Sequence, residues 1–366
     1  MIPQVRNTIR KVICLSVLPA LLQACSEGAE TPVPQPEGPA IRWSVCSDEA
    51  QVTRALVSDD VLRTSCTPDA YGNSESIGVW GQYAIDEGGQ TNVYPEFVAT
   101  PLTYAPKQVD SNPYNAWNYP GEARMWQIGG RYDFRACYPQ ALMSSLMTQI
   151  DATIIQGGPV NTSVIQTDLL VAAAHVDTRT DVLSGPVPLN MQHVFSALRF
   201  KVRAEEGYVP PSGDGVTSCW LQNIGEGTNL FSPSGYLVHS GNKEPEITWY
   251  TYESVSTPMY KWENNGVSFK TEGILYTSNG TQTGKEYTGN EGWLLVVPQT
   301  IASGTLQFCY TLKSSPGQVF RVNIPAITYV HGMRYTYVLV IGGAGVELKL
   351  SIAKWNQLDS VYDIVL

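Results

Sequence analysis

The feature that most restricts the fold of this chain is the alternation of apolar and polar residues in short stretches along its length. Four clear examples are Ile77–Ile85, Arg131–Tyr138, Leu306–Leu312 and Val346–Ile352. Successive side chains of an extended strand point to opposite faces, so a period of two predicts strands with one face in a core and the other in water. In the second stretch the aromatic rings mark the expected core face, whereas Arg131, Asp133 and Arg135 mark the expected solvent face.

Other stretches lack this alternation and predict different elements. Trp293–Val297 and Tyr335–Ile341 are apolar at nearly every position, which is typical of strands buried on both faces. Asn265-Gly266 predicts the tight turn of a β-hairpin, because these two residue types tolerate positive φ angles. Helical patterns are scarce: Ala141–Ile150 is predicted to form two or three turns and Met191–Ala197 a single one.

The amino-acid composition also favours β-structure. The 366 residues include 20 Tyr, 9 Trp, 32 Gly and 24 Pro, and only 15% are charged. Aromatic strands separated by Gly and Pro turns are typical of all-β proteins. A cluster of structure breakers, Ser184–Pro188, separates two strand-rich halves. We therefore predict an all-β fold with little helix, made of two tandem β-sandwich domains of the transthyretin-like type at residues 41–185 and 186–366.

The N-terminus has the organisation of an export signal. Three basic residues among the first eleven precede the apolar run Val12–Leu22, which is too short to span a bilayer. The following Leu22-Gln23-Ala24-Cys25 resembles a lipobox, in which the cysteine becomes the acylated first residue of the mature protein. We predict a lipoprotein signal peptide at residues 1–24, lipidation of Cys25 with fatty acids such as palmitate, and a Pro-rich spacer at 25–40. The alternative is an ordinary signal peptide that is cut elsewhere.

The negative charge of the chain disfavours negatively charged partners. Removal of residues 1–24 takes away three basic residues and no acidic one, so the remaining 342 residues carry 20 Lys and Arg against 33 Asp and Glu. A formal net charge of −13 disfavours binding to nucleic acid or to anionic lipid surfaces. The predicted membrane attachment is therefore the lipid and not a basic patch.

Five cysteines remain beyond the predicted lipid attachment, and their number is odd. They are Cys46, Cys66, Cys137, Cys219 and Cys309. No pair has CxxC spacing, so neither a zinc site nor a dense disulfide framework is indicated. We interpret them as free buried cysteines, with Cys46–Cys66 as the one pair close enough in sequence to consider as a disulfide.

Several segments, in order, resemble the fimbrillin family, the type V pilins that include the Mfa-like fimbrillin lipoproteins. The segment that resembles it most is Val187–Val202, in which Pro-Leu is followed by a histidine and a basic, apolar strand. Further similar segments are Ile41-Arg42-Trp43-Ser44, Ile77–Trp80, Tyr132–Pro139, Asp168–Ala172, His331–Tyr337 and Lys354-Trp355. The resemblance covers about residues 41–360, and Trp80, Arg135 and the region 205–290 depart from it.

The resemblance implies a structural and adhesive subunit of a surface-exposed fimbrium on the cell outer membrane. In this family a trypsin-like protease removes the first strand, and a strand from the next subunit fills the vacated groove. Here Ile41–Cys46 would be the strand removed, Arg54 the cleavage position and Arg63 the alternative. The implied partners are other pilus subunits, the outer membrane through Cys25, the maturation protease, and a host or bacterial adhesion target.

The C-terminus is an apolar segment with a single charge, residues 361–366. An unpaired strand of this kind recruits other chains, so it must be paired somewhere. It either pairs within its own domain or is donated to a neighbouring subunit. We predict donation, with Val361, Ile364 and Leu366 as the apolar side chains of the donor strand.

No residue pattern indicates catalysis, a cofactor or a metal, and we predict that the protein is not an enzyme. None of the four histidines has the spacing of a metal-binding pair, and His193 is interpreted as a packing and capping residue. Asp59-Asp60 are interpreted as solvated turn residues, because neighbours in an extended chain face opposite sides.

An alternative function is a carbohydrate-binding surface lipoprotein of a glycan-uptake system. Such a protein would present a platform of exposed aromatic side chains, and Trp117, Trp126 and Trp220 are candidates for it. We assign these three residues instead to cores or to subunit contacts.

Overall fold

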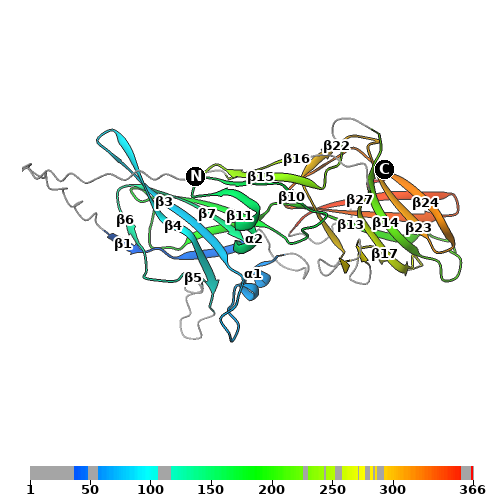
Figure 1. Cartoon of the computed structure of the whole chain (residues 1–366), viewed down its shortest axis with the longest axis horizontal. Helices are drawn as coiled ribbons and strands as arrows, with labels where there is room; N and C mark the ends of the chain where they lie inside the picture. The colour runs from blue at the N-terminus through cyan, green and yellow to red at the C-terminus, as the bar shows by residue number, and fades with distance from the viewer. Residues whose placement is uncertain are drawn as a thin grey trace, which may run out of the picture. The chain divides into compact units, whose positions relative to one another are not determined.

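The computed structural model describes residues 37–47, 57–105, 117–225, 230–242, 245–251, 258–270, 272–276, 281–282, 285–286, 292–355 and 364–365. Strands dominate this part of the chain, with two short helices (Figure 1). The predicted all-β fold is therefore confirmed. The predicted signal peptide, Cys25 and most of the spacer lie outside the described residues.

The first large sheet has seven strands and contains most of the N-terminal half. In spatial order it consists of β2 (Trp43–Ser47), β12 (Val187–His193), β11 (Leu170–Asp177), β7 (Arg131–Tyr138), β3 (Ile77–Glu87), β4 (Gln90–Tyr104) and β5 (Trp117–Asn118). All neighbours pair antiparallel except β2 and β12, which are parallel. The first and last strands of this order, β2 and β5, also contact each other, so the sheet curls back upon itself.

Two six-stranded sheets contain most of the C-terminal half. One consists of β18 (Gly273–Ile274), β13 (Ser196–Ala204), β26 (Met333–Gly342), β27 (Gly345–Lys354) and β28 (Ile364–Val365), with β21 (Trp293–Val296) also paired to β13. The other consists of β20 (Lys285–Glu286), β19 (Thr281–Gln282), β17 (Met259–Val267), β14 (Val216–Asn223), β23 (Leu306–Leu312) and β24 (Ser315–Ile324).

Smaller sheets complete the described part of the fold. One joins β10 (Val160–Asn161), β15 (Ser234–Ser240), β9 (Ile155–Gly157) and β8 (Met147–Ile150), with β16 (Glu246–Thr251) paired to β15. Two pairs stand alone: β1 (Glu37–Ala40) with β6 (Met125–Gln127), and β22 (Gln299–Ile301) with β25 (Ile327–Tyr329).

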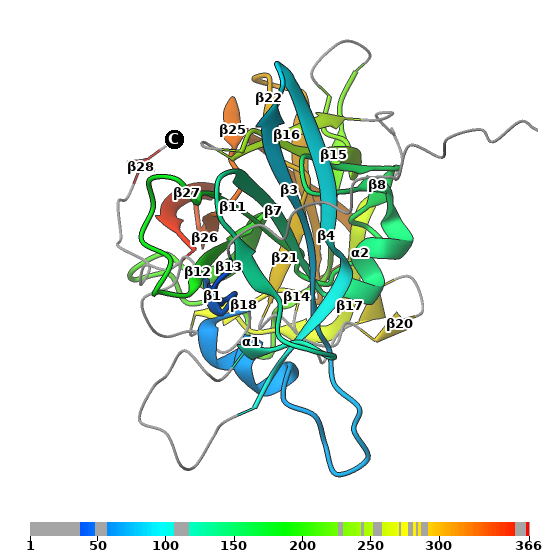
Figure 2. The same ribbon diagram turned by 90° about the vertical axis from the view of Figure 1, so that its left-hand side faces the viewer.

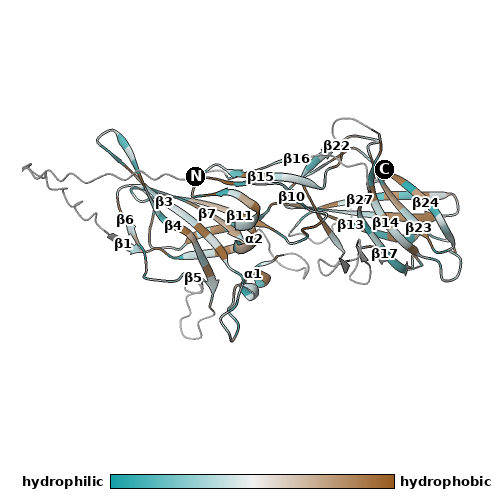
Figure 3. Cartoon of the chain, in the orientation of Figure 1, coloured by the Kyte–Doolittle hydropathy of each residue, from teal (hydrophilic) through white to brown (hydrophobic). Residues whose placement is uncertain are grey.

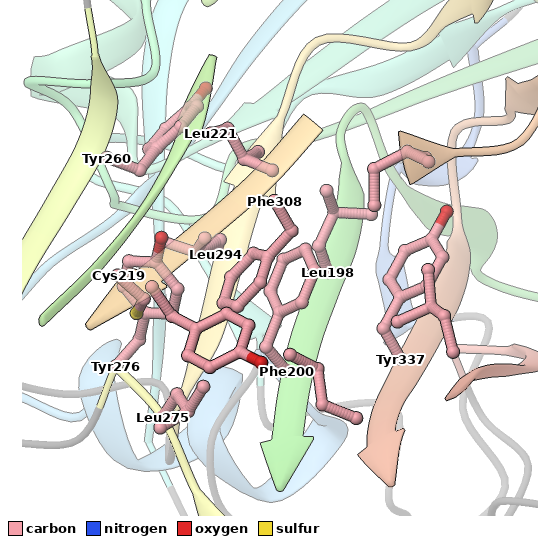
Figure 4. Close-up of a cluster of buried hydrophobic side chains, with 14 of the residues drawn as sticks. Leu198, Phe200, Cys219, Leu221, Tyr260, Leu275, Tyr276, Leu294, Phe308 and Tyr337 are labelled. Carbon is pink, nitrogen blue, oxygen red and sulfur yellow. The ribbon is translucent and has the colours of Figure 1, made fainter. Parts of the chain in front are cut away.

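Each half has an aromatic core, and a third cluster draws on residues from both. In the C-terminal half Phe200 stacks on Phe308 at 4.3 Å between ring centroids and on Tyr337 at 5.1 Å (Figure 4). Hydrophobic colours fall mainly on strands, whereas the tip of the β3–β4 hairpin is hydrophilic (Figure 3). Because β12 pairs with β2 and β11, the strand that begins at Val187 belongs to the first large sheet. The division into two domains at residues 185 and 186 stays a prediction.

The two helices are short, and neither is long and apolar enough to cross a bilayer. Helix α1 (Asp59–Ser65) begins after Ser58, whose side chain accepts a hydrogen bond from the Val61 amide. Helix α2 (Gln140–Leu146) ends where β8 begins, so only the first part of the predicted helix Ala141–Ile150 is helical. The predicted turn at Met191–Ala197 is wrong, because β12 and β13 occupy most of it as strand.

Two further predictions from local pattern are wrong. Strand β17 runs through Asn265-Gly266, and Gly266 takes a φ of +121° within it, so no hairpin turn forms there. On the predicted polar face of β7, Asp133 and Arg135 are buried, and only Arg131 is partly exposed. Arg135 is fully buried, where it donates hydrogen bonds to the carbonyl oxygens of Thr153 and Gly241.

Candidate functional site

The N-terminal segment Glu37–Ser47 is hydrogen-bonded to two parts of the N-terminal half. Figure 2 shows its first strand, β1, in dark blue. On one side β1 pairs antiparallel with β6, and the Ile41 amide donates to the Arg124 carbonyl at 2.8 Å. On the other side β2 pairs with β12, and the Val187 amide donates to the Arg42 carbonyl at 2.7 Å. This segment therefore fills the gap at which the curled sheet would otherwise stay open.

Alternate side chains of this segment point into the core. Ile41, Trp43 and Val45 are buried, with at most 5% of their surface exposed. The Trp43 ring packs edge-on against Phe97 and Phe134, at centroid distances of 5.3 and 5.1 Å. Burial of a large apolar side chain stabilises a fold by roughly 1.5–3 kcal/mol, so these three residues make this segment a substantial part of the core.

The end of β2 is fixed by the helix that follows it. The Asp59 carboxylate accepts hydrogen bonds from the Ser47 amide at 2.5 Å and from the Ser47 hydroxyl at 3.1 Å. The interpretation of Asp59 as a solvated turn residue is therefore wrong, whereas Asp60 is exposed. The helix cap at Ser58 is the sequence signal that identifies Asp59 as a residue of a first helical turn.

The two candidate cleavage positions differ in what the structure describes. Arg54 lies outside the described residues, between Ser47 and Val57. Arg63 is exposed on α1, and its guanidinium lies 3.8 Å from the Asp59 carboxylate and 3.7 Å from that of Asp60. A cut after Arg63 would thus fall within hydrogen-bonded helix.

The predicted donor strand is described only in part. Ile364 and Val365 form β28, whose backbone pairs with Leu350 and Lys349 of β27 in the same chain. Val361 and Leu366 lie outside the described residues. Donation of this strand to a neighbour stays a prediction.

None of the five described cysteines forms a disulfide with another described residue. Burial, with a smaller contribution from Glu75, raises the pKa of Cys66 to about 12, and burial raises the pKa of Cys137 and Cys219 as well. The Cys46 thiol donates to the Asn190 side chain at 3.0 Å and is not paired with Cys66. Since the thiolate is the reactive form, the buried cysteines are poor nucleophiles.

The histidines have structural partners or lie deep in the fold. His175 pairs with Asp133 at 2.7 Å and His193 with Asp168 at 2.8 Å. Burial, together with the positive charges of Arg135 and His331, lowers the pKa of His239 to about 3. Within the described ranges, no three His, Cys, Asp or Glu side chains are placed to hold a metal ion.

The tryptophans proposed for a sugar platform do not form one. Trp117 and Trp126 are buried, and Trp126 packs against Tyr132 at 4.8 Å between centroids. Trp220 is half-buried, and its indole donates to Gln222. The assignment of Trp117 and Trp126 to cores is confirmed.

These features define a class: an all-β protein in which β2, near the start of the described residues, is embedded in the core and the last described strand, β28, lies at the edge of a sheet. The sequence profile of the fimbrillin-like family matches residues 53–355, so the chain belongs to that family. Family membership supports a structural role in a pilus or in adhesion.

The chain is also similar to fimbrial proteins of known structure. A fimbrial protein from Bacteroides vulgatus is 16% identical, with a TM-score of 0.52, and the match covers 86% of this chain and 99% of the other. The tip fimbrial protein Mfa3 from Porphyromonas gingivalis, with a C-terminal truncation, is 12% identical, with a TM-score of 0.35, and the match covers 76% and 94%. At 16% identity, the likeness to the Bacteroides vulgatus protein concerns the fold alone. None of the curated proteins matches the chain.

Proposed function

We propose that this chain is a subunit of a type V pilus that matures by loss of its first strand and assembles by donor-strand exchange. The observation that carries the proposal is the placement of Glu37–Ser47: a short terminal segment buries an alternating row of side chains in the core. A permanent part of the core and an exchangeable strand both need such burial. Only an exchangeable strand also needs a cleavage position close behind it, and the sequence offers Arg54 there.

Removal of the first strand would create a groove lined by an unpaired backbone edge and by aromatic rings. The backbone of β12 would lose its parallel partner, and Phe97 and Phe134 would lose the ring of Trp43. A strand from another subunit would restore both, because β-augmentation combines backbone hydrogen bonds with alternating side chains in pockets. Each net hydrogen bond contributes roughly 0.5–1.5 kcal/mol, so a strand of ten or so residues forms a durable joint.

Arg54 is the preferred cleavage position. A cut after Arg54 removes β1 and β2 and leaves α1 intact, whereas a cut after Arg63 divides α1. Proteolysis favours exposed loops over hydrogen-bonded elements, because the scissile backbone must become accessible. The position of Arg63 within α1 thus supports Arg54.

The donor strand is proposed to be the C-terminal segment with Val361, Ile364 and Leu366. Its described part, Ile364 and Val365, pairs with β27 through two residues, whereas β2 pairs with β12 through five. Release of this described part is expected to cost less than release of β2.

The lipid anchor explains how the precursor is held at the outer membrane before assembly. Cys25, followed by a Pro-rich spacer, would place the folded part at the cell surface. Metabolic labelling with a fatty-acid probe should label the wild-type protein and not Cys25→Ser. A labelled Cys25→Ser protein would contradict lipidation at this residue.

Processing is tested by the pair Arg54→Ala and Arg63→Ala, each treated with a trypsin-like protease. We expect N-terminal sequencing of the wild type and of Arg63→Ala to begin at Ala55, with multimers on a sizing column. Arg54→Ala should keep its first strand and stay monomeric. Trimming of Arg54→Ala at residue 64 followed by normal assembly would refute the assignment of the cleavage position.

A further inference from the structure

The segment Glu37–Ser47 buries one large side chain among smaller ones. Its inward-facing row consists of four residues that are at most 5% exposed: Ile41, Trp43, Val45 and Ser47. Because protein cores are packed as densely as organic crystals, each of these side chains occupies a space of its own size. Departure of the segment would therefore leave three smaller spaces and one space of the size of an indole, which we call the Trp43 slot.

Two phenylalanine rings form walls of the Trp43 slot. Phe97 of β4 and Phe134 of β7 meet the indole edge-on, at 5.3 and 5.1 Å between ring centroids. Both rings also pack directly on the backbone of β3, where a Cβ added to Gly81 would lie 3.0 Å from Phe97 and 2.6 Å from Phe134. The rings cannot retreat towards β3, so the slot cannot widen on that side.

Contacts outside the slot hold the same two rings in place. The Arg124 guanidinium lies 4.2 Å from the centroid of the Phe97 ring, and Tyr119 packs edge-on against that ring at 5.6 Å. The Phe134 ring stacks on Tyr132 at 5.7 Å. Arg124, Tyr119 and Tyr132 do not belong to the departing segment, so these contacts remain when it leaves. The vacated slot would thus keep aromatic walls, which favour an aromatic occupant.

The alternation of side chains does not by itself fix the position of a strand in this groove. A shift by one residue turns the apolar row to solvent, but a shift by two residues restores the alternation. Such a shift would place an aromatic ring in the space of Ile41 or Val45 and an aliphatic side chain in the Trp43 slot. The ring would be overpacked and the aliphatic side chain would leave a cavity, and both effects are destabilising. Unequal spaces therefore select one register.

We propose that the Trp43 slot selects the incoming strand and fixes its register, because the slot accepts an aromatic side chain and the spaces beside it do not. This inference rests on the strand exchange proposed above and names the chemistry of the partner. The partner is a strand of another subunit whose inward-facing row has a large aromatic side chain next to a smaller aliphatic one. Phe97 and Phe134 are the residues that determine this specificity.

The test is a peptide titration of the mature chain, after trimming with a trypsin-like protease and inhibition of that protease. The reference peptide has the sequence of residues 37–47. The exchanged peptide carries Ile41→Trp together with Trp43→Ile, so its composition is unchanged and its ring is moved by two positions. We expect fluorescence anisotropy to show at least about thirtyfold weaker binding of the exchanged peptide.

Two further peptides calibrate this comparison. Trp43→Ala leaves the slot empty and should weaken binding about a hundredfold. Ser44→Ala, at a partly exposed position outside the inward-facing row, is the control and should bind as the reference peptide does. The released first strand competes equally with every peptide, so the ratios of their affinities hold.

The outcomes separate this inference from the strand exchange on which it rests. Equal binding of the reference and exchanged peptides would refute the slot and leave strand exchange intact, whereas no binding of any peptide would refute both. A second measurement does not depend on trimming: the untrimmed double variant Ile41→Trp, Trp43→Ile should unfold at a clearly lower urea concentration than the wild type. The same unfolding midpoint in both proteins would overturn the unequal spaces and with them the proposal.

Discussion

Strand β2, near the start of the described residues, and β28, the last described strand, both lie at sheet edges, yet they are held very differently. Strand β2 pairs with β12 through five residues, and Trp43 and Val45 on it are buried. Strand β28 pairs with β27 through two residues. A strand that fills the core leaves a void when it departs, whereas a short edge pairing is given up at little cost. Under the proposed exchange, the strand that leaves the groove must be firmly held before cleavage, whereas the donor strand must be easily released. The described pairings of β2 and β28 differ in this direction.

The largest effect on stability is expected from Trp43→Ala in the untrimmed protein. Loss of a fully buried indole should lower the free energy of unfolding by about 3–5 kcal/mol, measured by urea denaturation. Trp220→Ala, at a half-buried position on β14, is the control and should cost clearly less. After proteolytic trimming at Arg54 the variant and the wild type should become indistinguishable, because residue 43 is then absent from both. A difference that survives trimming would show that the first strand stays bound.

A smaller effect on stability is expected from Asp59→Ala, which removes the hydrogen-bond acceptor at the end of β2. Loss of its two hydrogen bonds from Ser47 should destabilise the untrimmed protein by about 1.5–3 kcal/mol. Asp60→Ala is a close control, since Asp60 lies in the same helical turn and near Arg63 but is exposed. It should change the unfolding free energy by less than about 0.5 kcal/mol. Equal losses in the two variants would mean that Asp59 acts through the helix and not through β2.

Sequence patterns predicted strands better than they predicted what surrounds each strand. The alternation in Leu306–Leu312 gave the correct faces, since Phe308 is buried and Gln307 is partly exposed. The same alternation in β7 did not, because the small sheet around β9 and β15 covers its polar face and supplies the carbonyls that Arg135 needs. Periodicity reports the geometry of a strand, whereas the burial of its second face depends on distant segments.

Local turn signals failed where long-range pairing opposed them. Asn265-Gly266 favours a hairpin, but β17 is paired with β14 on both sides of this dipeptide, so the strand continues.

At the candidate site, too, local sequence patterns did not predict contacts between distant segments. The segment Ile41–Cys46 was singled out by its resemblance to the fimbrillin family, whereas Arg124 and Asp59, which bond to Ile41 and Ser47, come from segments that no local pattern connects to it. The pairing of His193 with Asp168 likewise joins residues 25 positions apart.

The smallest effect on stability is expected from deletion of residues 360–366, and this variant tests the other side of the comparison. The described contact of this segment is limited to two residue pairs with β27, so the free energy of unfolding should change by less than about 0.5 kcal/mol. Assembly should nevertheless stop: after trimming at Arg54, sizing should show only monomers, because the groove is open but the donor is missing. Mixing the deletion variant with trimmed wild type should cap growing polymers and shorten them, since its groove still accepts a strand. A C-terminal half that unfolds on deletion would instead show that the segment belongs to its own core, and the donor would then have to be another strand.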